Sequence, residues 1–311
     1  MELIFFVGIP ASGKSTLANR YREQGYMVLS SDEIRSRITG GTPLETYSDR
    51  ERRQILTRVF DTIHRLCAEA LSQGRSVVID ATNLSRKRRM HFLQLFRQIS
   101  CTKVCLLFIT PVELCIARNR ARSGYGRVPD RDIHRLACSF ECPVPGEGWD
   151  EIRPVIWQEP YRFPYEAIEG FPQDNPHHTL TLDAHMASAE AFCRSHGFGP
   201  TLERVARYHD IGKFYTKRFE NYRGEPTQDA HYYGHESYSS LLYLAQMCCG
   251  REPSREEFLQ TLYEAALIGS HMRPLTRWRQ DPRSREQDVL LFGEAFIADL
   301  EKLHQADRAA H

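Results

Sequence analysis

The sequence predicts a parallel α/β sheet flanked by helices, followed by an all-helical domain. In the first 160 residues, short apolar runs alternate with longer stretches whose apolar residues recur at helical spacing. Such alternation is typical of a parallel sheet with crossover helices. Beyond about residue 175 the apolar runs give way to long helical patterns. The chain has 311 residues, of which 41% are hydrophobic, so it is long enough for two separate cores.

The first apolar run, residues 3–7, is followed by a glycine-rich loop. Residues 8–16 are Gly-Ile-Pro-Ala-Ser-Gly-Lys-Ser-Thr and match the pattern G-x-x-x-x-G-K-[ST] between an expected strand and an expected helix. Backbone N–H groups of such a loop surround phosphate at the positive end of a helix. We therefore expect ATP or another nucleoside triphosphate, with Lys14 on its phosphates and Ser15 on Mg²⁺. The residues expected to bind it are Gly8, Ser12, Gly13, Lys14, Ser15 and Thr16.

The same alternation predicts the rest of the sheet. Expected strands are residues 26–30, 76–80, 105–109 and 152–157, and expected helices are residues 14–24, 48–72 and 112–122. Two carboxylates follow or end these strands, at the edge where doubly wound sheets bind ligands. Asp80 is expected to support the Mg²⁺ ion or to hold Ser15. Asp32 either accepts a proton from an attacking hydroxyl or caps the next helix, and Arg35 is placed to bind a substrate phosphate.

The two halves of the chain differ in charge. Residues 1–160 contain 24 Lys and Arg against 18 Asp and Glu, whereas residues 161–311 contain 17 against 22. Arginine supplies 21 of the first 24 cations, which favours a polyanionic substrate because guanidinium binds phosphate bidentately. A solvated basic surface would give the same count. Arg118 and Arg122, four residues apart before a glycine-containing loop, indicate either a lid over the triphosphate or an ordinary exposed helix face.

Together these motifs resemble the kinase domain of bacteriophage-type polynucleotide 5′-kinases. The matching segments are residues 8–16, Ser31-Asp32-x-x-Arg35, Asp80-Ala-Thr-Asn83, Arg118 to Arg122 with Val128-Pro129, and residues 143–152. The resemblance implies that Asp32 is the general base for a 5′-hydroxyl, that Arg35 contacts the neighbouring phosphate, and that Arg118 and Arg122 bind the triphosphate. It also implies catalytic roles for Lys14 and Arg122, and further substrate contacts at Thr82, Asn83 and Arg88. P-loop kinases of small metabolites share part of this pattern.

We place the first domain at residues 1–160, a connection at residues 161–174 and the second domain at residues 175–311. Prolines and aromatic residues without a sustained period mark the connection. Ten of the thirteen histidines lie at or beyond position 177. Adjacent His209 and Asp210 would give mixed nitrogen and oxygen ligation, which suits Mn, Fe, Co, Ni or Zn.

The series His185, His209-Asp210, His235, His271 and Asp307 resembles the H...HD...H...H...D array of the HD phosphohydrolase superfamily, an all-helical fold. The resemblance implies that these residues bind one or two divalent metals, which activate water for phosphoester hydrolysis. It also implies that Lys213 and His178 contact the phosphate. Asp299 lies close enough in sequence to be an alternative to Asp307 as the last ligand.

Fusion of the two domains resembles bifunctional end-healing enzymes of RNA or DNA repair. Such enzymes phosphorylate a 5′-hydroxyl and remove a 3′-phosphate or 2′,3′-cyclic phosphate, and a separate ligase is then implied. Two other interpretations stay open: a nucleoside or nucleotide kinase fused to an HD nucleotidase, and a nucleotide-sensing module that regulates an HD hydrolase.

The remaining composition predicts a cytoplasmic protein without a membrane partner. Nine cysteines without a C-x-x-C pair favour reduced thiols. No segment approaches about 18 consecutive apolar residues, and no charged segment with a cleavage site precedes the first strand.

Overall fold

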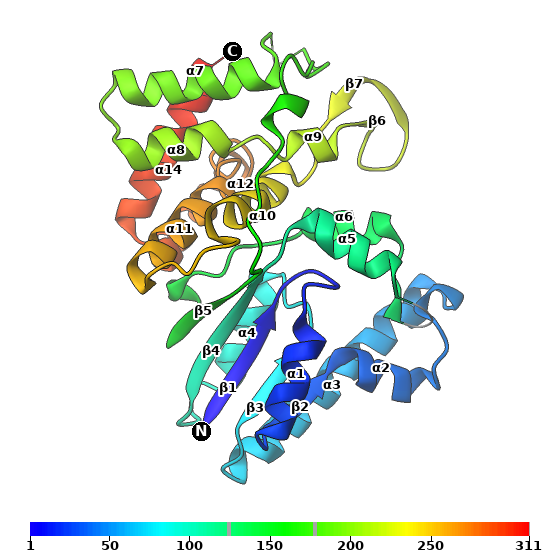
Figure 1. Ribbon diagram of the computed structural model, residues 1–311. Coiled ribbons are helices and arrows are strands. Elements are labelled where there is room, and N and C mark those ends of the chain that lie inside the picture. The colour runs from blue at the N-terminus through cyan, green and yellow to red at the C-terminus, as the bar shows by residue number, and fades with distance from the viewer. Residues whose placement is uncertain (123–125, 177–178, 311) are drawn as a thin grey trace. The chain divides into compact units, whose positions relative to one another are not determined.

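The computed structural model describes residues 1–122, 126–176 and 179–310 and divides the chain into two compact units. Unit 1 comprises Met1–Ile133 and Glu147–Val155, and unit 2 comprises His134–Gly146 and Ile156–His311 (Figure 1). Residues 134–146 and 156–174, which the sequence analysis assigns to the first domain or to the connection, group with unit 2. Each unit is described separately below.

Unit 1 contains a five-stranded sheet in the order β2-β3-β1-β4-β5. The strands are β1 (Glu2–Val7), β2 (Met27–Ser30), β3 (Val77–Asp80), β4 (Thr102–Ile109) and β5 (Glu151–Ile156). Strand β1 pairs in parallel with β3 and β4, and β2 pairs in parallel with β3. The chain therefore leaves the central strand β1 toward one side and later returns to the other side. Ligands bind at the carboxyl ends of strands at such a reversal, and here the phosphate loop follows β1.

The helices that begin in unit 1 are α1 (Lys14–Glu23), α2 (Ser31–Thr39), α3 (Asp49–Ser72), α4 (Arg86–Leu95), α5 (Val112–Arg120) and α6 (Asp130–Ala137), with a short 3-10 turn at Leu44–Thr46. A second 3-10 turn, Pro145–Glu147, begins in unit 2 and ends in unit 1. Helix α3 starts with a capping box. The N–H of Ser48 donates to Glu51 at 2.8 Å and the N–H of Glu51 donates to Ser48 Oγ at 3.4 Å. This S-x-x-E signature fixes the start of the long crossover helix.

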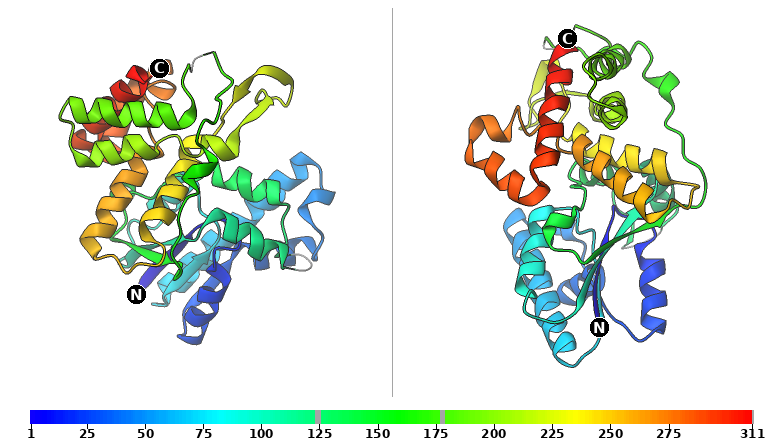
Figure 2. Two further views of the ribbon diagram at one scale, coloured as in Figure 1. Left: turned by 45° about the horizontal axis from the view of Figure 1, so that its top comes forward. Right: turned by 90° about the vertical axis from the view of Figure 1, so that its left-hand side faces the viewer.

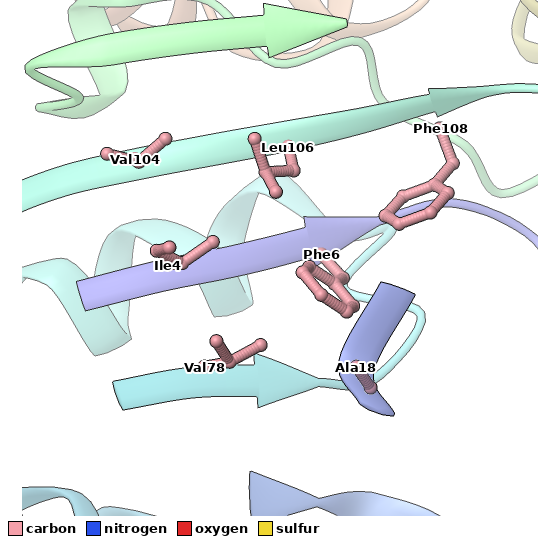
Figure 3. Close-up of a cluster of buried hydrophobic side chains, with 7 residues drawn as sticks. All are labelled: Ile4, Phe6, Ala18, Val78, Val104, Leu106 and Phe108. Atoms are coloured by element: carbon pink, nitrogen blue, oxygen red, sulfur yellow. The ribbon is translucent and has the colours of Figure 1, made fainter. Parts of the chain in front are cut away.

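Alternate residues of the central strands pack against opposite layers of helices. One face forms a core cluster of Ile4, Phe6, Ala18, Val78, Val104, Leu106 and Phe108, in which Ala18 belongs to α1 (Figure 3). On the other face, Phe5 contacts Phe92 of α4 with ring centroids 4.9 Å apart. The right-hand view of Figure 2 shows α1 on one side of the sheet and α3 on the other. Because both faces are covered, the buried parts of β1, β3 and β4 are almost entirely apolar.

Unit 2 consists mainly of helices. They are α7 (Leu182–Ser195), α8 (Pro200–Tyr208), α9 (Lys213–Thr216), α10 (His235–Cys248), α11 (Arg255–Ile268), α12 (Arg277–Gln280), α13 (Arg283–Phe292) and α14 (Glu294–Ala309), with a 3-10 turn at Tyr165–Ala167. No helix among the described residues is both long enough and apolar enough to cross a membrane. All nine cysteines are free thiols.

The expectation of helices alone was incomplete, because unit 2 also contains an antiparallel hairpin of β6 (Arg218–Glu220) and β7 (Pro226–His231). Its turn contains Gly224 with a φ of 80°, in the left-handed region that favours glycine. The N–H of Gly224 donates to the carbonyl of Asn221 at 2.9 Å. An Asn-x-x-Gly turn between short polar strands produces no apolar alternation, so the sequence pattern did not reveal the hairpin.

Candidate functional site

The phosphate loop connects β1 to the first turn of α1. Gly13, which precedes α1, has a φ of 103° in the left-handed region. A Cβ atom on Gly8 would lie 2.8 Å from Cβ of Phe108 and 2.9 Å from Oγ of Ser12. The backbone path therefore requires glycine at both positions. The other hydroxyl residues expected to bind nucleotide, Ser15 and Thr16, lie exposed at the start of α1.

The Lys14 side chain folds back over the loop. Its Nζ donates to the carbonyl oxygens of Gly8 at 2.9 Å and Ile9 at 2.7 Å. Burial lowers the pKa of Lys14 to about 8, although the charges of Asp80 and Asp32 act in the opposite direction. The ammonium group thus lies between neutral carbonyls and two carboxylates, where an anionic ligand would restore its full charge.

Asp80 and Asp32 both lie near Lys14 but differ in exposure. Asp80 ends β3 and is buried; burial raises its pKa and the positive charge of Lys14 opposes the rise. Asp32 lies in the first turn of α2, and its side chain is 72% exposed. The N-cap position of α2 belongs to Ser30, so capping is not the role of Asp32. Its Oδ1 accepts from Arg35 at 2.9 Å, which places a guanidinium beside the accessible carboxylate.

The helix expected as a lid is shorter than predicted. Helix α5 ends at Arg120, because the next six residues include two glycines, which are poor helix formers. Arg122 therefore follows the helix and does not share a helical face with Arg118. Its positive charge nevertheless lowers the pKa of Lys14, so its guanidinium is near the phosphate loop. Residues 123–125 of the expected lid lie outside the described residues.

Two of the four consecutive basic residues in α4 are structural. Arg89 is fully buried and forms a bidentate ion pair with Glu147, Nε to Oε2 at 2.7 Å and Nη2 to Oε1 at 2.6 Å. Arg86 reaches the same carboxylate at 3.3 Å. Arg89 also donates to the carbonyls of Asn83 and Leu84 at 2.9 and 2.8 Å. This network joins α4, the loop after β3 and the segment before β5, and sequence reasoning missed it.

The three residues expected to contact substrate after β3 have different environments. Asn83 is buried, and its side-chain amide donates to the carbonyl of Phe6 at 2.8 Å. Thr82 is half-buried. Arg88 is exposed, with its guanidinium 4.3 Å from the ring centroid of Phe60. Arg88 is therefore accessible to a ligand, whereas the Asn83 amide holds the loop against β1.

In unit 2, six of the residues expected to bind metal come together: His185, His209, Asp210, His235, His271 and Asp307. Their ligand atoms form two groups that share Asp210. One group contains His185, His209, Asp210 and Asp307, the other contains Asp210, His235 and His271, and the ligand atoms within each group lie within 4.8 Å of one another. Oδ2 of Asp210 is 3.3 Å from Nε2 of His185, and its Oδ1 is 3.1 Å from Nε2 of His235. Asp210 is thus common to both groups and faces each of them with a different carboxylate oxygen.

All four imidazoles use Nδ1 for a backbone carbonyl. The Nδ1 atoms of His209, His235 and His271 lie 2.7, 2.6 and 2.8 Å from the carbonyl three residues earlier in each case. That of His185 lies 2.8 Å from the carbonyl of Ala310. A carbonyl only accepts, so Nδ1 donates, and Nε2 is left facing the cluster as the ring atom that would bind a metal. Metal-ligating histidines usually donate their other ring N–H to a carbonyl or carboxylate in this way.

The charges of the cluster also fit a cation. Nε2 of His209 and Oδ1 of Asp210 are buried and have no hydrogen-bond partner among the described residues. Burial opposes the imidazolium of His185, but hydrogen bonds to Asp210 and Asp307 outweigh it and raise its pKa to about 9. The acceptor atoms that stabilise a proton here would stabilise a divalent metal in the same way.

The remaining residues expected at the phosphohydrolase site differ in placement. Lys213 is buried, with its Nζ 2.6 Å from Oδ2 of Asp210 and 2.8 Å from Oε1 of Gln173. Asp299 lies apart from the cluster, where it accepts from Tyr263 at 2.9 Å, so Asp307 is the distal carboxylate. His178 lies outside the described residues.

Sequence reasoning missed the role of Gly212 in the segment His-Asp-Ile-Gly-Lys. A Cβ there would lie 2.3 Å from the carbonyl of His235 and 2.8 Å from the backbone nitrogen of Ser239. The N–H of Gly212 also donates to Oγ of Ser239 at 2.8 Å. Only glycine lets the segment after Asp210 approach the start of α10 so closely. The glycine two residues after the His-Asp pair was the available signal.

Comparisons with known proteins support a P-loop domain in the N-terminal half of the chain. The model of the AAA domain family matches residues 3–143. The chain is 30% identical over 148 residues to a UPF0200 protein of Methanothrix thermoacetophila, and the match covers 45% of this chain and 75% of that protein. The chain therefore belongs to the same family as this UPF0200 protein. The N-terminal domain of the chain is a kinase-like P-loop domain, and two further relatives of the chain are named as kinases.

One such relative is the L-seryl-tRNA(Sec) kinase of Methanococcus maripaludis, 25% identical over 154 residues, which cover 48% of this chain and 56% of that protein. Another is the "Putative bifunctional polynucleotide phosphatase/kinase" of Acanthamoeba polyphaga mimivirus, 29% identical over 163 residues, which cover 50% and 33%. The chain thus spans about half the length of the archaeal kinase and a third of the length of the viral protein.

Proposed function

We propose that the chain is a bifunctional end-healing enzyme of RNA or DNA. Unit 1 would phosphorylate 5′-hydroxyl ends with a nucleoside triphosphate and Mg²⁺, and unit 2 would remove a 3′-phosphate or 2′,3′-cyclic phosphate. The observation that supports this most strongly is the combination, in one chain, of a phosphate loop and a buried cluster of four imidazoles and two carboxylates. The two chemistries act on opposite ends of a broken strand.

In unit 1 the phosphate loop supplies backbone donors, and Lys14 exchanges its bonds to the Gly8 and Ile9 carbonyls for phosphate oxygens. Asp32 is exposed near Lys14 and accepts the proton of the attacking hydroxyl. Asp80, buried at the end of β3, would be one of the residues that hold Mg²⁺. Arg122 adds positive charge near the loop where the transferred group develops negative charge.

The acceptor is proposed to be a polynucleotide for two reasons. Arg35 lies 2.9 Å from Asp32, so a guanidinium stands beside the hydroxyl base and can bind the phosphate that follows a 5′-terminal nucleoside. In addition, two relatives are named for nucleic-acid substrates, a seryl-tRNA and a polynucleotide. A small metabolite without a phosphate would leave this guanidinium without a ligand.

In unit 2 the residues fit one or two divalent metals, held by His185, His209, Asp210, His235, His271 and Asp307. When bound, such ions supply Lewis acidity and an activated water. The chain itself orients every imidazole through Nδ1, and it neutralises Asp210 through Lys213 at 2.6 Å. Burial of the cluster limits the number of competing waters around the ligands. Mn, Co, Ni, Zn or Fe suit these nitrogen ligands better than Mg²⁺ does.

The test is to incubate the protein with an oligonucleotide that has a 5′-hydroxyl and a 3′-phosphate, with ATP, Mg²⁺ and separately Mn²⁺, Ni²⁺, Co²⁺ or Zn²⁺. Both ends are then mapped by mass spectrometry. We expect a 5′-phosphate and a 3′-hydroxyl, and sealing only after a separate ligase is added. Phosphorylation of free nucleosides as efficiently as of oligonucleotides would contradict the polynucleotide assignment. An unchanged 3′ end with every metal would contradict the hydrolase assignment.

A further inference from the structure

The six candidate metal ligands of unit 2 are together called the metal cluster, and they contribute only part of the lining of a much larger cavity. The cavity has a volume of about 740 Å³ and includes Asp210, His235, His271 and Asp307 in its lining. Metal ions with their waters need a small fraction of this space, since one water takes about 30 Å³ in the liquid. A volume of this size is typical of sites for drug-sized ligands or nucleotides. The rest of the lining should therefore recognise the part of the substrate that does not react.

Helix α14 presents three different groups to this cavity. His304, Asp307 and Arg308 all line it, and their spacing of three and four residues puts them on one face of the helix. Asp307 belongs to the metal cluster, so a ligand at the metal can reach the other two. Nδ1 of His304 is buried and has no hydrogen-bond partner among the residues that the structure describes. The helix thus supplies a metal ligand beside two groups suited to an anion.

A second guanidinium comes from α12. Arg279 lines the same cavity and is exposed, as is Arg308. Within the described ranges, neither side chain forms an ion pair or a hydrogen bond. Their neighbour Arg277, by contrast, donates to Gln287 at 2.8 Å and lies 3.6 Å from Asp288. Among the described residues, Arg279 and Arg308 therefore have no counter-ion, and a bound anion could supply one.

The end of β7 and the segment that follows it contribute an aromatic wall to the cavity. Tyr233 lines it and is 38% exposed, with its ring stacked on that of His231 at 5.3 Å and 8°. The guanidinium of Arg218 lies 4.4 Å from the centroid of Tyr233. Nucleic-acid bases stack on such aromatic and guanidinium surfaces without sequence preference. If the anion bound between the metal and the arginines belongs to a nucleotide, its base can stack on this wall.

We propose that Arg279 and Arg308 form an anion subsite, which binds the phosphodiester adjoining the reacting phosphate of a polynucleotide end. This inference rests on the proposed hydrolase function of unit 2 and names its specificity. The guanidinium groups supply paired N–H donors that match phosphate oxygens. A substrate with a single phosphate uses only the metal cluster, whereas one with a neighbouring phosphate uses both. Unit 2 therefore selects strand ends over isolated phosphate monoesters.

A pair of small substrates isolates this subsite. Adenosine 3′-monophosphate has only the reacting phosphate, whereas adenosine 3′,5′-bisphosphate also has a 5′-phosphate in the position of the adjoining phosphodiester. The measured quantity is the ratio of their kcat/KM values with the full-length, Mn²⁺-loaded protein. We expect the parent to favour the bisphosphate, and Arg279→Ala and Arg308→Ala each to lower the ratio about tenfold, the size of a lost charged hydrogen bond.

Arg277→Ala is the matched control, because Arg277 lies on the same helix but is paired and does not line the cavity. Its ratio should equal that of the parent. The manganese content of each variant is also measured. A parent-like content in Arg308→Ala shows that the substitution has not disturbed the neighbouring residue Asp307. Parent-like ratios in both Arg279→Ala and Arg308→Ala would overturn the subsite.

If the parent hydrolyses neither nucleotide, the proposed hydrolase function fails and the subsite is decided separately. Calorimetric titration with adenosine 3′,5′-bisphosphate then measures affinity directly. Weaker binding to Arg279→Ala and Arg308→Ala, with parent-like binding to Arg277→Ala, supports the anion subsite. Equal binding to all four proteins contradicts it.

Discussion

The phosphate loop of unit 1 occupies nine consecutive residues, whereas the metal cluster of unit 2 draws six side chains from positions 185 to 307. The loop binds through backbone groups, whose directions are set locally by glycines at positions 8 and 13. The cluster depends on helices far apart in sequence. A local site follows from a short motif, and a dispersed site exists only once its unit has folded.

Local geometry still matters in the dispersed site. His209, His235 and His271 are each oriented by the carbonyl three residues earlier, so each ring is fixed by its own local turn at the end or start of a helix. His185 is the exception, because its Nδ1 pairs with Ala310 at the other end of unit 2. Tertiary packing therefore has to bring together rings that are mostly already oriented. The two sites should consequently fail independently when either is damaged.

The largest expected effect is loss of one metal ligand. His209→Ala should reduce hydrolysis of the 3′ end to background, because it removes a buried ligand that faces both Asp210 and Asp307. Kinase activity should survive, since unit 1 has its own sheet and phosphate loop. Both ends of one oligonucleotide substrate are assayed together. Parent-like hydrolysis by this variant would mean that the histidine cluster is structural.

Metal removal tests the same independence without a mutation. Chelation followed by dialysis should abolish hydrolysis, and Mn²⁺, Co²⁺, Ni²⁺ or Zn²⁺ should restore it better than Mg²⁺, because four imidazoles face the site. The kinase, assayed with Mg²⁺ alone, should be unaffected. Full hydrolysis by protein shown to be metal-free would exclude a metal mechanism.

Mutations at the phosphate-loop site should have the opposite effect, since they should impair the kinase and spare the hydrolase. Lys14→Ala and Asp32→Ala should lower 5′-phosphorylation by about a hundredfold or more, since each removes a group placed on the reacting atoms. Hydrolysis of the 3′ end serves as the internal control. Asp32→Asn keeps the size of the side chain and should be equally inactive. Turnover of Asp32→Asn within a few-fold of the parent would refute the general base.

Arg88 and Arg89 are adjacent, but Arg88 is exposed and Arg89 is buried in an ion pair, so their substitution should have different effects on stability. Arg89→Ala leaves the Glu147 carboxylate buried, and this should destabilise unit 1 by about 3–5 kcal/mol. Arg88→Ala removes an exposed contact with Phe60 and should cost under about 1 kcal/mol. Urea unfolding is followed by Trp149, which donates to Glu147 at 3.2 Å, in a background without the other two tryptophans. Equal stability of the two variants would contradict the assignment.

The Arg86 to Arg89 segment also shows where prediction from sequence ends. The strands, the crossover helix and the phosphate loop could be predicted, because apolar spacing and glycine positions report on local backbone geometry. Arginine content cannot tell an exposed charge from a buried one. The partner of Arg89 lies 58 residues away, at Glu147, and only folding reveals it.

In unit 2 the order of His and Asp residues indicated which side chains come together, but their geometry was not predictable. That Asp210 is shared by two groups, and that Asp307 and not Asp299 joins them, depends on how α14 packs against α7 and α8. Gln173 was missed for the same reason, since its contact with Lys213 spans 40 residues and has no motif. The hairpin was missed because its strands are short and polar.

The smallest expected effects distinguish the two arginines near the phosphate loop. Arg122→Ala should raise KM for ATP more than KM for the oligonucleotide, because its charge lies near Lys14. Arg35→Ala should do the reverse, because Arg35 lies beside Asp32, the proposed base for the acceptor hydroxyl. Losing one phosphate contact should also reduce the slope of log affinity against log salt by about one for the oligonucleotide. That change should appear in Arg35→Ala and be absent in Arg122→Ala, so the two variants control for each other. If both variants change the ATP and oligonucleotide parameters equally, the arginines act through the general charge of the surface, and the assignment of one to the donor and one to the acceptor is wrong.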